Sequence, residues 1–449
     1  LVFRTPDDQL AGHGSLFGSV RTYNSQGKLG HADAWSIGAA LKKVRLNGQL
    51  FNSMSSMTRI DDDGSEQSFL MDSSIAATYV SSGGVGAYDK ITYDSVKGQF
   101  VWQDGSTGLI ERYEGSGAGR LLSSTDASGN TRTYAYGPNG KLSSVTDASG
   151  GVTYYDYVGQ NLTQIRTATV ENGVQVMQTR VRYGYDGLGR LSAVSIDLTP
   201  EDGSIADGKV FQTFYTYDGD SDRLASVSQT DGTQLSFTYV QDGADFRVSS
   251  VTDALGQVTR YTYSYGLTTV VNPKGEATLF QHNYSTGQLR TVTTPPVNGV
   301  SQVTTFTMDG KGNVTRIDQT GGYSVTMTYD SRGNQLSWSD SGRNVVNRTY
   351  DSGNRVLTEI SYVVPMTQTG GAARGELTTR YVYDAAGRLR FHINPVGNVT
   401  EYRYNAYGER VSTLSYAGDV FPIRTLAVNE SATLTRMESW AATVNFSRV

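Results

Sequence analysis

Tyrosine followed directly by aspartate recurs along the chain, and such a pair could act as a general acid and base. Clear examples are Tyr185-Asp186, Tyr329-Asp330 and Tyr383-Asp384. Catalysis needs one constellation of residues, whereas this pair returns many times at a regular interval. We therefore interpret it structurally, with the tyrosine packed on a sheet and the aspartate capping a turn.

The segment 218–222 reads Asp-Gly-Asp-Ser-Asp and resembles the start of a calcium-binding loop. That loop requires glycine at its sixth position and glutamate at its twelfth. This chain has Arg223 and Gln229 at those positions. The segment also coincides with a turn of the recurring motif, so we interpret it as a polar hairpin turn.

The other residues that could carry chemistry form no catalytic or metal-binding pattern. Cysteine is absent, which excludes thiol nucleophiles and zinc ribbons. The glycine-rich run 115–120 lacks the lysine of a phosphate-binding loop. The four histidines are scattered, at His13, His31, His282 and His392. We therefore expect no enzyme activity, no cofactor and no metal site.

The composition is typical of a polar, turn-rich β protein. The 449 residues include 51 glycines and 29 tyrosines but only 9 prolines. Glycine supplies the positive φ of tight turns, and tyrosine suits a half-exposed sheet. The net charge is −5 and no polybasic run exists, so nothing in the charge pattern favours nucleic acid or an anionic membrane. No segment reaches the ~20 apolar residues that span a bilayer.

A motif of the form Tyr-Asp-x-x-Gly, often followed by Arg-Leu, recurs with a period of about 21 residues. It alternates with a second turn of the form Asp-Ala-Ser-Gly, as at 126–129. A related copy begins at Tyr23. We expect a structural role for the motif residues of the clearest copies: Tyr185, Asp186, Gly189 and Leu191; Tyr329, Asp330 and Gly333; Tyr350, Asp351 and Gly353; Tyr383, Asp384, Gly387 and Leu389; Tyr404 and Gly408.

This period fits one hairpin, because two strands of ~5–6 residues and two turns of ~4 fill it. In the segment 399–404, the side chains of Thr400, Tyr402 and Tyr404 face one side of a predicted strand. The return strand is expected at 411–414. One hairpin is not stable alone, so neighbours must stack. The sequence thus predicts an all-β fold: a long antiparallel sheet that curls because sheets twist.

The recurring Tyr-Asp-x-x-Gly-Arg-Leu motif resembles the YD repeats of the RHS family. This family includes bacterial polymorphic toxins, the B and C components of insecticidal Tc toxins, wall-associated proteins and animal teneurins. The resemblance covers roughly residues 93–413. It implies that the hairpins spiral into a hollow shell, or into part of one.

In the family's bacterial toxins the shell encloses a C-terminal effector. The resemblance therefore implies a secreted or surface-exposed bacterial shell whose partner is a toxin cargo, or further shell segments of the same parent protein. The alternative is a teneurin-like adhesion module that binds cell-surface carbohydrate through its tyrosine-rich faces. Family toxins carry an Asp-Pro motif near a self-cleavage site; no Asp-Pro dipeptide occurs here, so no cleavage residue is assigned.

We divide the chain into three parts. Residues 1–90 are expected to form degenerate N-terminal β repeats of the shell, and residues 91–415 the YD-repeat array. Residues 416–449 are expected to form a linker and a short, truncated C-terminal helix. Because the chain begins with leucine instead of methionine, we interpret it as a fragment or a processed product.

The C-terminal helix is predicted from helical spacing of apolar residues, at Leu434, Met437, Trp440 and Val444, with Ser431 as its N-cap. Three intervals between motif copies are longer than the period. They are rich in Gly, Thr, Asp and Gln, and we predict surface loops at 167–180, 196–213 and 362–380.

Overall fold

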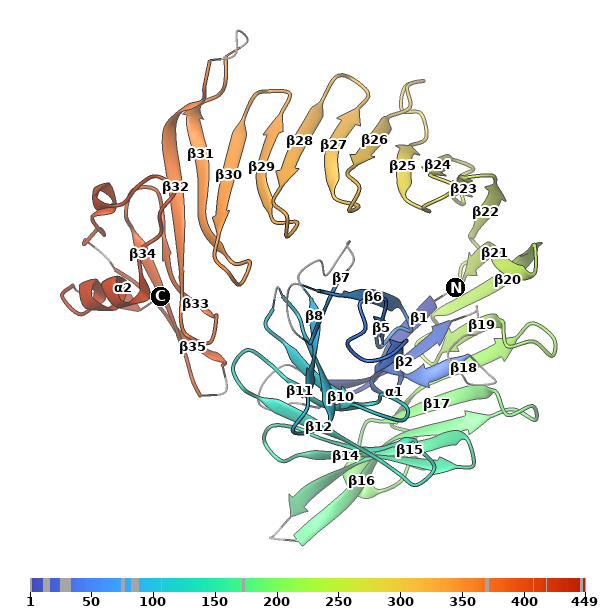
Figure 1. Cartoon of the computed structure of the whole chain (residues 1–449). Helices are drawn as coiled ribbons and strands as arrows, with labels where there is room; N and C mark the ends of the chain where they lie inside the picture. The colour runs from blue at the N-terminus through green and yellow to red at the C-terminus, as the bar shows by residue number, and fades with distance from the viewer. Residues whose placement is uncertain are drawn as a thin grey trace.

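The structure of the chain is a computed structural model, and it confirms the all-β prediction. It describes residues 2–10, 17–24, 34–73, 77–81, 89–105, 107–171, 174–367, 371–406, 408–416, 418–444 and 447–448. The repeat copy that begins at Tyr23 runs on into residues outside this set, and His13 and His31 also lie outside it. One antiparallel sheet contains most of the strands, each paired with its neighbour in sequence (Figure 1).

The sheet begins with a small coil of short strands: β4 (Lys43–Asn47), β5 (Ser56–Ile60), β6 (Glu66–Met71), β7 (Thr78–Ser81), β8 (Lys90–Asp94), β9 (Gln99–Gln103) and β10 (Ile110–Glu114). The coil folds back on its first strand, because the N–H of Val44 donates to the carbonyl of Gly119 at 2.9 Å. A Cβ at Gly119 would overlap the Val44 carbonyl oxygen, so only glycine permits this approach. The apolar centre of the coil includes Phe69 and Ile91, which are fully buried.

The repeat array continues from this coil. Its first half contains β11 (Leu121–Thr125), β12 (Thr131–Tyr136), β13 (Leu142–Thr146), β14 (Val152–Val158), β15 (Asn161–Glu171), β16 (Val174–Tyr185), β17 (Leu191–Asp197), β18 (Val210–Tyr217), β19 (Leu224–Gln229), β20 (Gln234–Asp242), β21 (Asp245–Asp253), β22 (Val258–Ser264) and β23 (Leu267–Val271). Each strand pairs antiparallel with the next, as the hairpin period predicts.

Its second half contains β24 (Ala277–His282), β25 (Leu289–Thr293), β26 (Val303–Met308), β27 (Val314–Gln319), β28 (Ser324–Tyr329), β29 (Gln335–Asp340), β30 (Val345–Tyr350), β31 (Val356–Val364), β32 (Arg374–Tyr383), β33 (Leu389–Ile393), β34 (Val399–Tyr404), β35 (Arg410–Ser415) and β36 (Ser447–Arg448). The strand expected at 399–404 is β34, and its return strand is β35. The first strand of this sheet, β4, pairs along its length with β5, and the last strand, β36, pairs with β35. Among the described residues these two end strands do not pair with each other, so the sheet is open.

A β-bulge recurs at the motif tyrosine. The register shifts between Gly184 and Tyr185, between Thr328 and Tyr329, and in the same place in most other copies. A bulge bends its strand and increases the local twist. Repetition of the same bulge in successive hairpins therefore adds up to the arc seen in Figure 1.

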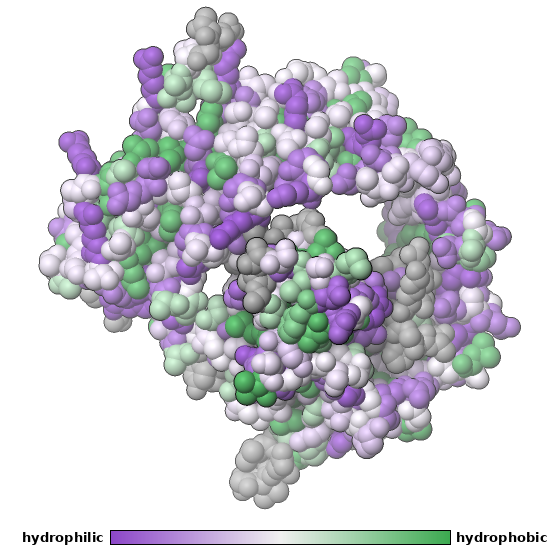
Figure 2. All heavy atoms as spheres, viewed as in Figure 1, coloured by the Kyte–Doolittle hydropathy of each residue, from purple (hydrophilic) through white to green (hydrophobic). Residues whose placement is uncertain are grey.

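The far end of the array returns to the first coil. The side-chain amide of Asn354 donates to the carbonyl of Gly105 at 3.3 Å, although 249 residues separate them. The turn at Gly408 lies against Ser128, so closely that a Cβ at Gly408 would overlap the Ser128 hydroxyl. The array thus forms a ring around an opening, which is visible in the space-filling view (Figure 2).

The first three strands form a separate sheet, β1 (Val2–Leu10), β2 (Phe17–Asn24) and β3 (Trp35–Ile37), followed by the short helix α1 (Gly38–Leu41). This sheet packs on the concave side of β14–β19 (Figure 1). Ser19 bonds to the Tyr155 hydroxyl and Arg21 donates to the Tyr215 hydroxyl, both at 2.8 Å. The domain boundaries expected at residues 90 and 415 stay predictions.

The C-terminal segment covers the opposite face of the sheet. It contains the 3-10 turn η2 (Ile423–Thr425) and the helix α2 (Leu434–Ala441), which pack on β32–β35 from outside the ring (Figure 1). Trp440 contacts the rings of Tyr416 and Phe421. The two ends of the chain therefore cover two different faces of the same sheet.

Two details of the predicted helix are wrong. Its N-cap is Thr433, whose side chain accepts from the N–H of Arg436, and not Ser431. Ser431 instead donates its hydroxyl to the carbonyl of Tyr381 on the sheet, a tertiary contact that no local pattern encodes. Val444 lies beyond the end of the helix, although it packs against the same core.

Two of the three predicted loops are largely strand. In 167–180, β15 and β16 extend into one long hairpin, and in 362–380, β31 and β32 do the same over a shorter distance. Cross-strand pairing satisfies the backbone of these threonine- and valine-rich segments better than a loop could. The interval 196–213 does contain a loop, with the 3-10 turn η1 (Pro200–Asp202).

Candidate functional site

Most motif tyrosines bond their repeat to the preceding one. The hydroxyl of Tyr350 donates to the carbonyl of Gln335 at 2.8 Å. The same bond to a preceding backbone carbonyl is made by Tyr136, Tyr185, Tyr217, Tyr239, Tyr263, Tyr329, Tyr383 and Tyr404. These side chains therefore add a second connection between hairpins, beside the backbone ladder.

The motif aspartate holds its turn. Oδ1 of Asp186 accepts from the N–H groups of Leu188 and Arg190, both at 2.9 Å, and Oδ2 accepts from the Arg190 guanidinium at 2.8 Å. Burial opposes the charge, but these hydrogen bonds prevail and lower the pKa of Asp186. Asp330, Asp351 and Asp384 cap their turns in the same way.

The fourth residue after the motif tyrosine adopts a left-handed conformation. Gly189, Gly333, Gly387 and Gly408 occupy this position with φ of 79–81°. In the copy at Tyr350 the left-handed residue is Asn354, with φ of 62°, and not Gly353. Asparagine tolerates this conformation better than most residues with a side chain. Gly353 uses its N–H to bond Asp351.

The arginine that follows the motif glycine connects two repeats. The guanidinium of Arg190 lies 4.4 Å from the centroid of the Tyr217 ring while it pairs with Asp186. Arg355 over Tyr383 and Arg388 over Tyr404 repeat the arrangement, each at 4.9 Å. The motif leucines Leu191 and Leu389 stand opposite the tyrosines Tyr185 and Tyr383 of their own hairpins.

An apolar row runs along the concave face between β24 and β30. Directly paired residues share one face of a sheet, and Phe280 pairs with Val292, Phe306 with Ile317, and Met327 with Trp338. We call Phe280, Val292, Phe306, Ile317, Met327, Trp338 and Val346 the inner row. Each of its side chains is half-buried.

The inner row continues a face that the N-terminal sheet covers elsewhere. Strand pairings connect Phe237, which is buried in the core beneath β1–β3, to Val251 and from there toward Phe280. No described segment packs on the inner row as β1–β3 pack on the first half. The row therefore faces the opening that Figure 2 shows.

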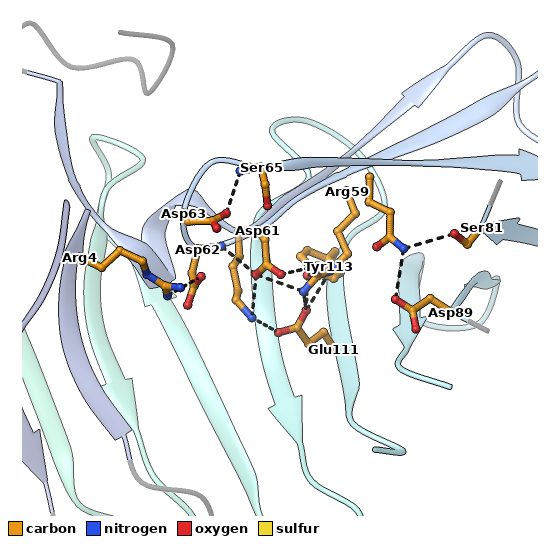
Figure 3. A network of polar contacts seen from close by, with 12 residues as sticks. Arg4, Arg59, Asp61, Asp62, Asp63, Ser65, Ser81, Asp89, Glu111 and Tyr113 are labelled. Carbon is orange, nitrogen blue, oxygen red and sulfur yellow. Dashed lines mark hydrogen bonds and ion pairs between the residues drawn. The ribbon is translucent and has the colours of Figure 1, made fainter. Parts of the chain in front are cut away.

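A buried charge network lies where the first coil closes (Figure 3). Glu111 is 1% exposed and pairs with Lys42 at 2.6 Å and with Arg59 at 2.7 Å, and the Tyr113 hydroxyl donates to it at 2.5 Å. Burial alone would raise the pKa of Glu111, but the two cations outweigh burial and lower it. Arg59 also pairs with Asp61.

The opposite charges of this network compensate one another. We therefore interpret the network as a structural contact that holds the two ends of the coil together, and not as a reactive centre. Lys42 adjoins the strand that closes the coil, and Glu111 comes from β10 at the coil's other end. Arg59 stacks on Trp102 with 3.8 Å between guanidinium and ring centroid. Sequence reasoning missed this cluster because its members come from four separate strands and loops.

A second buried carboxylate lies under the C-terminal segment. Glu401 is 1% exposed and pairs with Arg390 at 2.5 Å and Arg403 at 2.8 Å. The Tyr416 hydroxyl also bonds to it. Burial would raise the pKa of Glu401, but these partners lower it. In sequence, the only signal was a charged residue on a strand otherwise suited to packing.

The remaining candidates form no reactive site in the part of the chain that the structure describes. No group of three or more metal-ligating side chains comes together there. In the calcium-loop-like segment, the Asp218 carboxylate pairs with Arg223 at 2.8 Å. Within the same residues, no helix is long and apolar enough to cross a membrane.

Residues 116–152 match the family model of the RHS repeat, which confirms the resemblance at the level of the repeat. This segment covers β11 to β13 and the turns beside them. Residues 116–152 thus contain an RHS repeat. No curated protein matches it.

Solved structures with a similar arrangement include the TcdB2-TccC3 complex, at 12% identity and a TM-score of 0.40, covering 84% of this chain and 25% of that one. The TcdB2-TccC3-Cdc42 structure gives the same identity and score, with 82% and 24% covered. A Photorhabdus luminescens Tc holotoxin pore covers 84% and 23%, again at 12% and 0.40. The chain spans about a quarter of the length of these proteins.

Proposed function

We propose that this chain is a wall segment of a secreted, hollow RHS- or Tc-type shell that encloses a protein cargo, and that it has no enzymatic role. The observation that carries the proposal is the uncovered inner row, because apolar side chains on a concave face need a partner. The two ends of the chain already cover the neighbouring parts of the sheet, and neither covers this stretch.

The inner row suits a weak and unspecific hold on a cargo chain. Its side chains are half-buried between neighbours, so each offers only part of its surface. Small polar residues such as Thr304 stand between them on the same face. Many shallow apolar contacts can retain an extended chain without selecting one sequence or one fold.

We further propose that the motif residues keep the wall rigid. Tyrosine bonds the preceding hairpin, aspartate and glycine fix the turn, and arginine stacks on the following tyrosine. The tyrosine and arginine contacts cross from one hairpin to its neighbour, so the wall resists opening between repeats. A continuous ladder also leaves few unpaired strand edges at which cargo or another chain could add a strand.

The test uses the full-length parent protein and adjacent residues on β26 and β28. Phe306→Lys with Met327→Lys places two charges on the inner row, and Thr307→Lys with Thr326→Lys places two charges on the outer face of the same strands. Thr307 and Thr326 are exposed, so both pairs should fold. We expect the inner pair to expose the proposed cargo of the parent protein to protease, and the outer pair to leave the protection of that cargo unchanged.

Equal protection in both variants would refute containment by this face. Loss of protection in both would indicate damage to the wall instead, which a comparison of their melting temperatures would reveal. Negative-stain images of the same preparations provide a second readout, because a shell shows a low-density centre and a solid rod does not.

A second candidate is adhesion to a carbohydrate-bearing surface. Tyr265 and Tyr284 are 78% and 65% exposed, and their rings stack at 3.8 Å between centroids. Exposed aromatic rings bind the apolar faces of sugars by stacking. Saturable binding to a glycan array that Tyr265→Ala and Tyr284→Ala abolish would favour adhesion over containment.

A further inference from the structure

A pocket of about 170 Å³ lies where the N-terminal sheet meets the concave face of β12–β16. Trp35 on β3 and the motif tyrosines Tyr136, Tyr157 and Tyr185 are among the residues that line it. A cavity of ~150 Å³ accommodates a benzene ring. The pocket is therefore large enough for a six-membered ring with one small substituent, held between aromatic walls.

The motif loses its aspartate in two successive repeats at this pocket. Gly137 and Val158 stand where other copies have aspartate after the tyrosine. In three of those other copies the carboxylate pairs with the arginine four residues later, as in Asp186 with Arg190. Here the corresponding cation, Lys141, has no ion-pair partner among the residues that the structure describes, and its ammonium donates to the backbone carbonyl of Gln160.

The pocket is consequently rich in positive charge. Arg21, Arg120 and Lys141 all line it, and no aspartate or glutamate does so among the described residues. Arg120 is neutralised by Glu114 outside the pocket, whereas the Lys141 ammonium lies 4.9 Å from the centroid of the Tyr157 ring. Burial lowers the pKa of Lys141, as expected for a cation whose charge nothing nearby compensates.

Tyr157 also departs from the other motif tyrosines. Tyr136 and Tyr185 donate their hydroxyls to preceding carbonyls, of Leu121 and Leu162. For the Tyr157 hydroxyl no hydrogen-bond partner exists in the described part of the chain, although Tyr157 lines the same pocket. Burial raises the pKa of Tyr157 to about 12, so the hydroxyl stays protonated at neutral pH and can donate.

We propose that this pocket binds a small ring-shaped carboxylate, with its ring between Trp35 and the motif tyrosines and its carboxylate toward Lys141 and the Tyr157 hydroxyl. The unpaired ammonium and the unused hydroxyl supply two donors for one anionic group. The aromatic walls accept either a flat aromatic ring or the apolar face of a sugar ring. The proposal is independent of cargo containment.

The experiment is a titration of the full chain, followed by calorimetry, with two matched pairs of probes. Benzoate and benzyl alcohol share a ring but differ in charge, and so do glucuronate and glucose. We expect at least one carboxylate to bind and its neutral counterpart not to bind. Binding of benzoate alone identifies an aromatic acid, and binding of glucuronate alone identifies an acidic sugar. Failure of both carboxylates, or equal binding of a carboxylate and its neutral counterpart, overturns the proposal.

Two tyrosine variants separate binding from folding. Tyr157→Phe removes a hydroxyl that bonds none of the described residues, so we expect an unchanged melting temperature and about a five- to tenfold weaker affinity. Tyr263→Phe removes a hydroxyl that bonds Val248 far from the pocket, so we expect a lower melting temperature and unchanged affinity. Lys141→Met should weaken binding further. Unchanged affinity in Tyr157→Phe and Lys141→Met would refute the assigned donors.

Discussion

The guanidinium of Arg388 lies 4.9 Å from the centroid of the Tyr404 ring, one repeat further along the chain, while it pairs with Asp384 at 2.7 Å. One side chain thus joins the turn of its own hairpin to the tyrosine of the next. Tyr404 in turn donates to the carbonyl of Leu389 in the repeat before it. The contacts run in both directions, so neighbouring hairpins are connected twice.

Replacement of this arginine tests the connection. Arg388→Met keeps much of the aliphatic volume but removes both the ion pair and the cation–π contact. We expect a loss of about 1 kcal/mol in the free energy of unfolding, measured by urea denaturation. Arg316→Met is the matched control, because among the described residues Arg316 has a single ion pair, with Asp318 on the solvent-exposed face. An equal loss in both variants would contradict the special role of Arg388.

Two glycines of one motif turn, Gly187 and Gly189, allow a second test. Gly189 has φ of 79° and Gly187 does not have a positive φ, yet a Cβ at either position would meet no atom within 4 Å. Gly189→Ala should therefore cost about 1–2 kcal/mol in unfolding free energy, through backbone conformation alone. Gly187→Ala should be neutral or slightly stabilising. Thermal melts of the two variants check this, and a similar melting temperature in both would refute it.

Much of this architecture was predictable because it is local and repeated. The tyrosine, aspartate and glycine of each copy indicate a strand followed by a tight turn. The interval between successive copies fixes the length of a hairpin. The alternation in 399–404 placed Tyr402 and Tyr404 together on one face of β34, as the pairing of β34 with β35 requires. The role of arginine was not predicted, because it depends on a ring in the following repeat.

The features that the sequence did not reveal depend on distant contacts. The recurrent bulge needs two strands in register before it exists, and the separate sheet β1–β3 carries no motif that distinguishes it. Glu111 and Lys42 are 69 residues apart, and only the closure of the first coil brings them together. The replacement of the motif aspartate by Gly137 and Val158 was visible in sequence, but its consequence for Lys141 needed the pocket.

The motif tyrosines should contribute alike wherever their hydroxyl is bonded. Tyr350→Phe removes the bond to Gln335 and leaves a half-buried carbonyl unpaired. We expect a loss of about 1 kcal/mol in unfolding free energy, with no change in the slope of the urea transition. Tyr323→Phe is the control, since Tyr323 is 47% exposed. A loss that also appears in the control would show that removal of any tyrosine hydroxyl, and not of the bond to Gln335 in particular, is responsible.

Acid should destabilise the first coil through Asp61. Burial opposes ionisation, but Lys42 and Arg59 lower the pKa of Asp61 from 3.8 to about 2. A carboxyl group with a lower pKa in the folded state stabilises the fold above its unfolded pKa, and this contribution is lost as pH falls toward about 2. Asp61→Asn should therefore flatten the stability curve between pH 4 and pH 2. The pKa of Asp62 is instead raised above 3.8 by burial and by Asp61, so protonation of Asp62 adds stability as pH falls toward 3.8. Asp62→Asn should therefore steepen the acid loss of stability just above this pH, which urea titrations reach when they begin at about pH 6. Urea titrations across this range measure both slopes, and an unchanged slope in Asp61→Asn would refute the assignment.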